Sequence, residues 1–158
     1  MMSKTHKTVF DLGSTYLSIV KNSAGSRLFR HSFGRVAGRR TDLTRGGRLS
    51  CAFFVSSVLR MFGLIKEQHT TVAGTVRDLE RSGWRRVAKP RPGDVLVWEA
   101  VPGSGGPHEH IGFFAGAGQA ISNSARRRMP ERHHWTYGTR SGRPVRRVIA
   151  AYRHPKLA

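Results

Sequence analysis

The single cysteine of the sequence, Cys51, stands at the start of the apolar run "LSCAFFVSSVL". A lone cysteine excludes a disulfide within the chain and a metal cluster built from several cysteines. At the first turn of a helix, a thiol lies near unpaired backbone N–H groups and the positive end of the helix dipole, and both favour the thiolate. Cys51 is therefore either a nucleophile or, because it borders the apolar stripe of that helix, a small core residue.

A cysteine nucleophile needs a base within reach and a third group that orients this base. Among the eight histidines, His110 is the candidate base, because it begins the apolar stretch "HIGFFAG" that predicts a strand. The third group falls in "AISNS", where Asn123 or Ser122 would lie across from His110. We favour Asn123, whose amide oxygen accepts in a fixed plane. Strand alternation lets one of the two face His110, and a bulge after the turn at 116–118 would select Asn123.

The elements that must position these residues follow from the apolar spacing. Ser50 is a suitable N-cap, and apolar residues at helical spacing predict a helix over 51–62 that ends at Gly63. A second helix is predicted from Thr70 or Thr71 to Gly83. Its charged residues are expected to face away from the apolar side: Arg77, Asp78, Glu80 and Arg81.

Strands are predicted at "VLVWEA" (95–100) and within "VRRVIAAYRH" (145–154), and residues 110–124 predict a β-hairpin. Asp94 is expected to close the turn before the first of these strands. Because helices precede strands, the fold class is predicted as α+β, with N-terminal helices packed on one face of an antiparallel sheet.

The charge of the chain indicates an anionic partner. Lys and Arg number 28 against nine Asp and Glu, which gives a formal net charge of +19 and suits a cell-wall polymer or a nucleic acid. No apolar run approaches the roughly 18 residues that span a bilayer. Asp11 and Ser14 interrupt the stretch where a signal peptide would be apolar, so no signal peptide is recognised, and the expectation is a cytoplasmic protein or export by another route.

Three segments in this order resemble the NlpC-type cell-wall cysteine peptidases of the papain-like superfamily: "SCAFFVSSVLRMFGL", "PGDVLVW" and "HIGFFAGAGQAIS". The resemblance covers roughly residues 48–124 and implies a papain-like hydrolase domain, which we expect over 49–158. Residues 1–48 are rich in Gly, Ser, Thr and Arg and are expected to form a loosely structured basic arm or cap packed on it. The resemblance also implies Cys51 as nucleophile, His110 as base, a third polar residue in "AISNS", and neither cofactor nor metal. The substrate it implies is an amide bond in a peptidoglycan stem peptide, cut by a protein that we expect to be a monomer.

Other residues are candidates for substrate contacts: Trp98, Arg126, Arg127 and His134. The backbone N–H of Cys51 is expected to stabilise an oxyanion. Two rival interpretations remain open. The first is a zinc site, for which no acidic or cysteine ligand follows at a recognisable spacing; its histidines would be His108, His110, His133 and His134. The second is a non-catalytic binding module that holds nucleic acid or another polyanion on the basic, aromatic segment 124–147.

Overall fold

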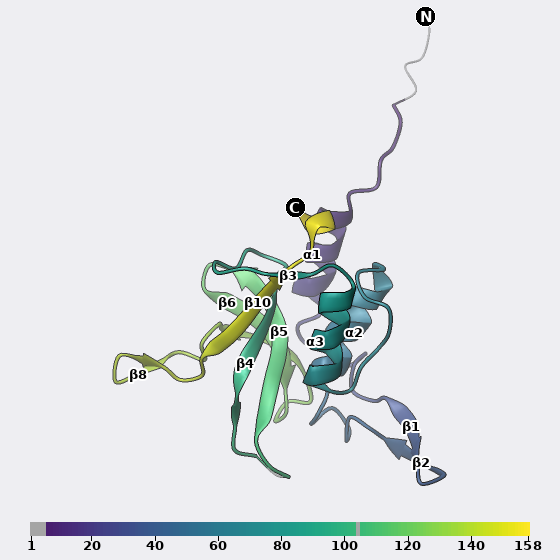
Figure 1. Ribbon diagram of the computed structural model, residues 1–158, viewed down its shortest axis with the longest axis vertical. Helices are drawn as coiled ribbons and strands as arrows, with labels where there is room; N and C mark the ends of the chain where they lie inside the picture. The colour runs from purple at the N-terminus through teal and green to yellow at the C-terminus, as the bar shows by residue number, and fades with distance from the viewer. Residues whose placement is uncertain (1–5, 104) are drawn as a thin grey trace, which may run out of the picture.

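The computed structural model describes residues 6–103 and 105–158 (Figure 1). Residues 1–5 of the predicted arm lie outside this part of the chain. The helices are α1 (Leu12–Asn22), α2 (Cys51–Met61), α3 (Val72–Arg81) and the short 3-10 helix η1 (Pro155–Leu157). The strands are β1 (Phe33–Val36), β2 (Arg39–Asp42), β3 (Arg85–Arg86), β4 (Val95–Val101), β5 (His108–Gly116), β6 (Gln119–Ser124), β7 (Met129–His134), β8 (Thr139–Arg140), β9 (Arg143–Pro144) and β10 (Val148–Arg153). The predicted α+β class is confirmed.

The main sheet has six antiparallel strands in the order β3-β10-β4-β5-β6-β7. Helices α1, α2 and α3 all contact β5, the strand that carries His110. Alternation along β5 sends Ile111 and Phe113 into the core cluster that includes the helices. A second, smaller cluster is built around Leu96 and Trp98, with Trp135 and Tyr137 packed against it. The sheet is therefore covered by helices on one face and by the chain after β7 on the other.

Helix α2 holds Cys51 at its first position, as predicted, and ends at Met61. Its large apolar side chains Phe54, Val55, Val58 and Leu59 are fully buried. Each such burial contributes about 1.5–3 kcal/mol, which anchors the first turn of the helix against the sheet. Ser50 occupies the N-cap position without capping through its side chain, because its hydroxyl donates to the backbone oxygen of Phe29 instead.

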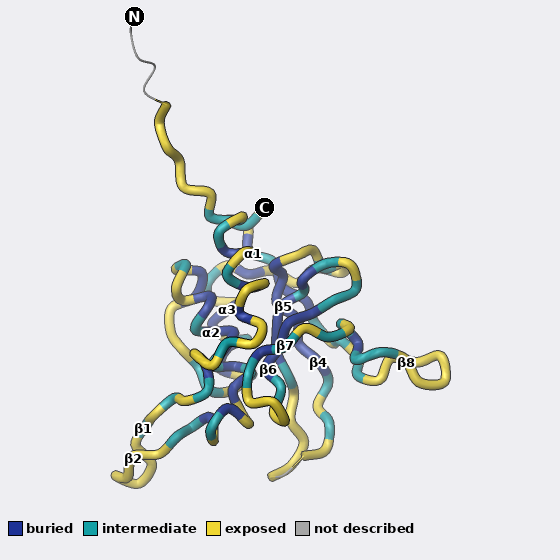
Figure 2. Tube along the Cα trace, turned by 180° about the vertical axis from the view of Figure 1, so that it is seen from behind, coloured by how far each residue is buried: buried dark blue, intermediate teal, exposed yellow. Residues whose placement is uncertain are grey.

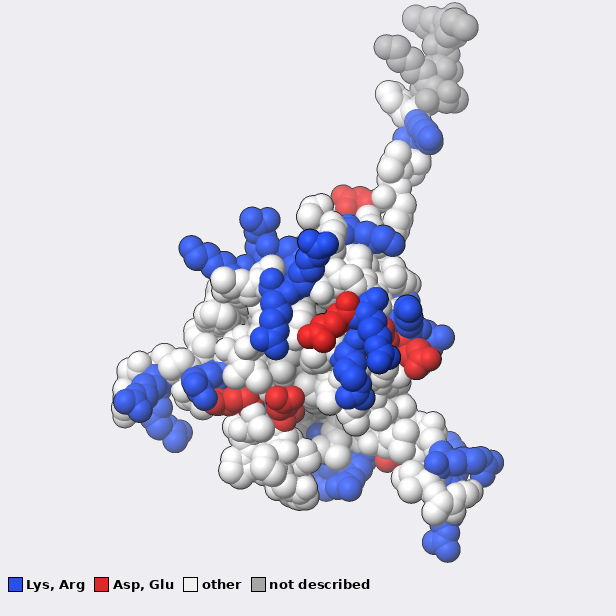
Figure 3. Space-filling model, in the orientation of Figure 1, with Lys and Arg blue, Asp and Glu red and all other residues white. Residues whose placement is uncertain are grey.

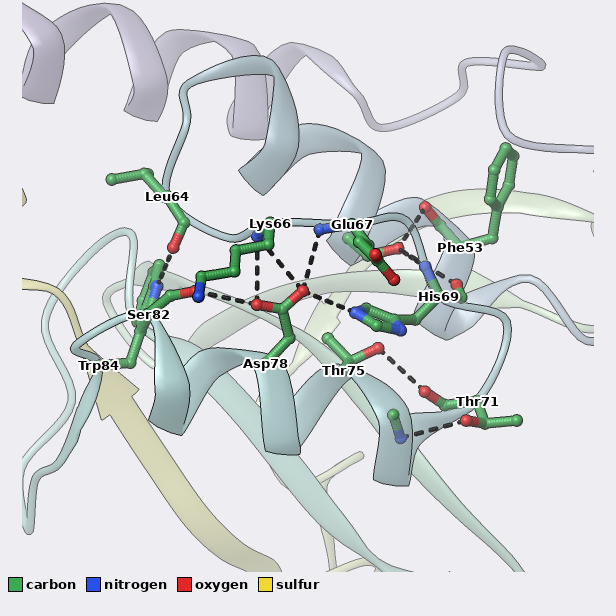
Figure 4. Close-up of polar contacts among 12 residues, drawn as sticks. Phe53, Leu64, Lys66, Glu67, His69, Thr71, Thr75, Asp78, Ser82 and Trp84 are labelled. Atoms are coloured by element: carbon green, nitrogen blue, oxygen red, sulfur yellow. Dashed lines mark hydrogen bonds and ion pairs between the residues drawn. The ribbon is translucent and has the colours of Figure 1, made fainter.

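Helix α3 begins with Thr71 as N-cap, whose hydroxyl accepts from the N–H of Gly74. The expectation that Asp78 faces away from the core is wrong, since this residue is 6% exposed. Figure 4 shows its carboxylate accepting from the backbone N–H groups of Lys66 and Glu67, from Ser82 and from His69. Burial raises the pKa of Asp78, but these donors outweigh it and lower the pKa to about 2. A buried carboxylate is tolerated here because several donors surround it.

The N-terminal region contains ordered elements that the sequence analysis did not predict. Asp11 caps α1 by accepting from the N–H of Ser14, so the polar residue that interrupts the apolar stretch starts a helix. Tyr16 and Val20 of α1 are buried in the main core, and the Tyr16 hydroxyl donates to the Gly93 oxygen at 2.7 Å. Strands β1 and β2 form a separate hairpin that projects from the domain (Figure 1). Part of this region is thus built into the core.

Segment 124–147 is also more ordered than a loop. It forms β7, which pairs with β6, and the projecting hairpin β8–β9. The predicted role of Asp94 is confirmed, because its carboxylate accepts from the N–H of Arg91 at 2.7 Å and closes the turn before β4. Arg153 donates to the same carboxylate at 2.6 Å. No helix in the described part of the chain has the length and apolar character to cross a membrane.

Candidate active site

The sulfur of Cys51 lies against β5, directly beside the strand position of the candidate base. The backbone N–H of Ile111, the residue after His110, is near enough to the sulfur to lower the pKa of the thiol. Strand β6 pairs with β5 only from the pair Gly112–Ser122 onward, so Ile111 has no partner on β6. The sulfur therefore lies beside β5 just beyond the end of the β5–β6 pairing. Helix α2 and strand β5, which are far apart in the sequence, thus bring Cys51 next to the backbone of His110.

Burial raises the pKa of the Cys51 thiol above its ordinary value. The N–H groups of Ile111 and Ala52 and the charge of Arg146 act in the opposite direction, but they do not offset the burial. The backbone N–H groups at the start of the helix favour the thiolate, as expected, but burial has the larger effect on the pKa. The cysteine is a thiol at neutral pH, and a reaction would need a base to remove its proton.

His110 is held as a neutral imidazole on β5. Burial is the main cause that lowers its pKa, and the charges of Arg146 and His133 lower it further, to about 3. Its ring packs at 5.4 Å, between centroids, on the fully buried Trp98. A neutral ring with a fixed orientation is in the protonation state that a general base requires at neutral pH.

Ser122, rather than Asn123, contacts His110. The Ser122 Oγ lies 2.9 Å from His110 Nε2. Asn123 points to the opposite face of β6, where its Nδ2 donates to the backbone oxygen of Gly47 at 2.8 Å. The pairing of β6 with β7 is continuous, and the irregularity near the turn lies on β5 between Phe114 and Gly116. No bulge within β6 therefore turns Asn123 toward the histidine, and the preference for Asn123 is corrected.

Two further polar residues meet at Ser122, and the sequence analysis did not find them as a group. His133 Nε2, on β7, lies 2.7 Å from the Ser122 Oγ. The hydroxyl of Tyr137, after β7, lies 3.1 Å from the same oxygen. The rings of His133 and Tyr137 are stacked, with centroids 4.1 Å apart. Recognising residues 129–134 as a strand paired with "AISNS" would have been the signal that links His133 to Ser122.

Arg146, between β9 and β10, brings a positive charge close to this group. Its Nε donates to the Glu99 oxygen at 3.0 Å, and its Nη2 donates to the His108 oxygen at 2.8 Å. Two backbone carbonyls from β4 and β5 thus fix the guanidinium. Its charge lowers the pKa of both Cys51 and His110, although burial is the larger effect on each.

The residues predicted to touch substrate take other positions. Trp98 is fully buried, its Nε1 donates to the Trp135 backbone oxygen at 2.7 Å, and its ring packs against that of His110. His134 is exposed, and its Nδ1 accepts from the backbone N–H of Thr136 at 3.3 Å within the turn after β7. Arg126 and Arg127 are exposed between β6 and β7. Arg127 Nη1 lies 3.7 Å from the Glu131 carboxylate, and both arginines are exposed where a large anionic ligand could reach them.

Exposed arginines gather on the projecting parts of the domain. The hairpin β1–β2 carries Arg35, Arg39 and Arg40, and the hairpin β8–β9 carries Arg140 and Arg143. Figure 3 shows Lys and Arg side chains covering both hairpins, and Figure 2 shows the exposure of the two chain segments. Part of the positive charge is therefore carried on structures that reach outward from the domain, and the rest lies on its body (Figure 3).

Within the described residues, no group of three or more His, Cys, Asp and Glu side chains could hold a metal ion, the histidines near Ser122 included. Neither a protein-family model nor a curated protein matches the sequence. The interpretation of the site therefore depends on its own geometry.

Proposed function

We propose that this protein is a papain-like cysteine hydrolase of the NlpC type, which cleaves amide bonds through Cys51, His110 and Ser122. The observation that carries the proposal is the meeting of three elements. The sulfur at the start of α2 lies near the backbone N–H of Ile111, next to His110, and His110 Nε2 is hydrogen-bonded to Ser122. A nucleophile, a base and an orienting group in this order are the parts that covalent catalysis by cysteine requires.

The reaction follows from the protonation states. Because His110 Nε2 is bonded to Ser122, Nδ1 is the nitrogen left to take the proton of the Cys51 thiol. The sulfur then forms a bond to the substrate carbonyl carbon, and the backbone N–H of Cys51 is the proposed donor to the oxyanion. The protonated His110 gives its proton to the leaving amine as the C–N bond breaks. Water, activated by the same histidine, hydrolyses the thioester and restores the thiol.

The proposed substrate is a peptidoglycan stem peptide. Its carboxylates suit a protein with a formal charge of +19, whose arginines extend on two hairpins and on the β6–β7 turn. Such a surface would concentrate the protein on an anionic wall, and the attraction would weaken as salt screens it.

The basic hairpins also support a second candidate function, a binding module for nucleic acid or another polyanion, in which Cys51 only packs against the core. Exposed Phe33 lies under the Arg40 guanidinium at 3.9 Å, so the β1–β2 hairpin pairs an aromatic ring with positive charge. Such a pairing is used in the binding of single-stranded nucleic acid.

The experiment compares wild type with Cys51→Ala and His110→Gln on purified peptidoglycan, with released fragments identified by mass spectrometry. The proposed function requires new peptide fragments from wild type and their loss in both variants. Equal fragment patterns in all three proteins would overturn it. Arg39→Gln with Arg40→Gln serves as the matched control, since it changes the hairpin charge and leaves the site intact. Retained cleavage with weaker wall binding is expected for this control.

A further inference from the structure

The contacts of His133 determine which of its ring nitrogens carries the proton. Its Nδ1 lies 2.7 Å from the backbone oxygen of His134. A carbonyl oxygen can only accept a hydrogen bond, so Nδ1 must be the donor. Burial lowers the pKa of His133, which keeps the ring neutral at neutral pH. A neutral imidazole has one donor and one acceptor, and Nε2 is therefore the acceptor.

This assignment determines the direction of every hydrogen bond at Ser122. Its Oγ lies 2.7 Å from His133 Nε2, so the single hydroxyl hydrogen points to that nitrogen. The oxygen then offers its two lone pairs to His110 Nε2 at 2.9 Å and to the Tyr137 hydroxyl at 3.1 Å, which must both donate. A serine hydroxyl has one hydrogen and two lone pairs, so all its capacity is used. His110 carries its proton on Nε2 and a lone pair on Nδ1.

We propose that His133 is a positioning residue that acts through Ser122 to hold His110 in the tautomer whose Nδ1 can accept the Cys51 proton. The effect on catalysis rests on the proposed function, whereas the assignment of the protons on His133, Ser122 and His110 does not. Without an acceptor at position 133, the Ser122 hydrogen is free to turn toward His110 Nε2. That arrangement admits the other tautomer, whose proton on Nδ1 would block proton transfer from the thiol.

Tyr137 provides the matched comparison. Its ring stacks on His133 with an interplanar angle of 16°, and its hydroxyl only fills a lone pair of Ser122. Both His133→Phe and Tyr137→Phe leave an aromatic ring in the stack, and each removes the polar atoms that contact Ser122. His133→Phe removes the acceptor that orients the Ser122 hydroxyl, whereas Tyr137→Phe removes a donor that has no effect on this orientation. A role in packing alone predicts the same behaviour for both variants.

The test is nitrogen-15 NMR of the histidine rings at neutral pH, together with kcat and KM on peptidoglycan. We expect His133 protonated on Nδ1 and His110 on Nε2 in wild type, in Cys51→Ala and in Tyr137→Phe. His133→Phe should give a second His110 tautomer and a kcat about tenfold lower with an unchanged KM, whereas Tyr137→Phe stays within about twofold.

A wild-type spectrum with the proton on His133 Nε2 or on His110 Nδ1 overturns the proposal, even if His133→Phe fails to fold. An unchanged single tautomer of His110 in folded His133→Phe overturns the positioning role. If wild type shows the expected tautomers but releases no wall fragments, the proposed function is wrong while the assignment of the protons is correct. The two failures are therefore distinguishable.

Discussion

Replacing Asp78 tests whether the loop between α2 and α3 is held by a buried carboxylate. Asp78→Ala removes the acceptor of two backbone N–H groups and of the Ser82 and His69 side chains. Hydrogen bonds to a charged group contribute about 1.5–3 kcal/mol each but are not additive, and loss of one partner of a buried charged group costs about 3–5 kcal/mol. We expect Asp78→Ala to lower the free energy of unfolding by about 3–5 kcal/mol.

Asp78→Asn should cost less, for a reason visible in the contacts. One carboxylate oxygen, Oδ2, meets Lys66, Glu67 and His69, whereas Oδ1 meets Lys66 and Ser82. An amide can keep its oxygen at the Oδ2 position, where it still accepts from Lys66, Glu67 and His69, and its NH2 group can donate to the Ser82 hydroxyl. The charge and the contact of the Lys66 N–H with Oδ1 are lost. The pKa of Asp78, lowered from 3.8 to about 2, converts to about 2 kcal/mol of stability at neutral pH. We expect a loss of this size for Asp78→Asn.

Urea denaturation at neutral pH, followed by tryptophan fluorescence, measures both changes. Glu80→Gln on the same helix is the control, since this carboxylate is exposed and should change stability by less than about 0.5 kcal/mol. The folded-state pKa lies below the unfolded value, so the Asp78 contribution is present above about pH 4 and is lost as the pH falls toward 2. Losses below about 0.5 kcal/mol in both Asp78 variants, or equal losses in the two, would refute this reasoning.

Further predictions concern the site and the sheet. Burial, with Arg146 and His133, lowers the pKa of His110 from 6.5 to about 3, so the unfolded chain binds more protons than the folded one between these pH values. Urea titrations at several pH values should show the free energy of unfolding falling by up to about 1.4 kcal/mol per pH unit below pH 6.5. His110→Gln should remove most of that slope. Because burial raises the pKa of Cys51, its rate of alkylation should rise with a midpoint above that of a free thiol, and a midpoint near neutral pH would contradict the resting thiol. Arg153→Ala leaves the buried Asp94 without its charged partner and should cost about 3 kcal/mol by urea denaturation; a loss below about 1 kcal/mol would show that the pair matters little.

The sequence predicted those elements whose apolar spacing is regular and local. Helix α2 and the β5–β6 hairpin were found because their buried residues recur at the period of a helix or a strand. Strand β7 was missed because its polar and charged composition, with exposed Arg132 and His134, is typical of a basic loop. Its partner β6 gives β7 its place in the sheet, and pairing between strands does not appear in local composition.

The site shows the same limit at the level of single residues. Cys51 and His110 could be proposed from the helix start and from the strand start, each a local feature. The choice between Ser122 and Asn123 depended on which face of β6 meets β5, which the register decides. Asp78 was placed outside because a charged residue is usually exposed, and only the folded loop supplies the donors that reverse this.

Adjacent residues of β6 perform separate tasks on its two faces. On one face of β6, Ser122 contacts His110. On the other face, Asn123 donates to the backbone oxygen of Gly47, which lies four residues before Cys51. A slip of this strand by one residue would exchange the two side chains, since neighbouring positions point in opposite directions. Such a misfolded chain would lose the partner of the histidine and the tether of the cysteine segment together. The alignment of one short strand therefore determines both halves of the candidate site, and errors in its pairing would disrupt that site even with the helices in place.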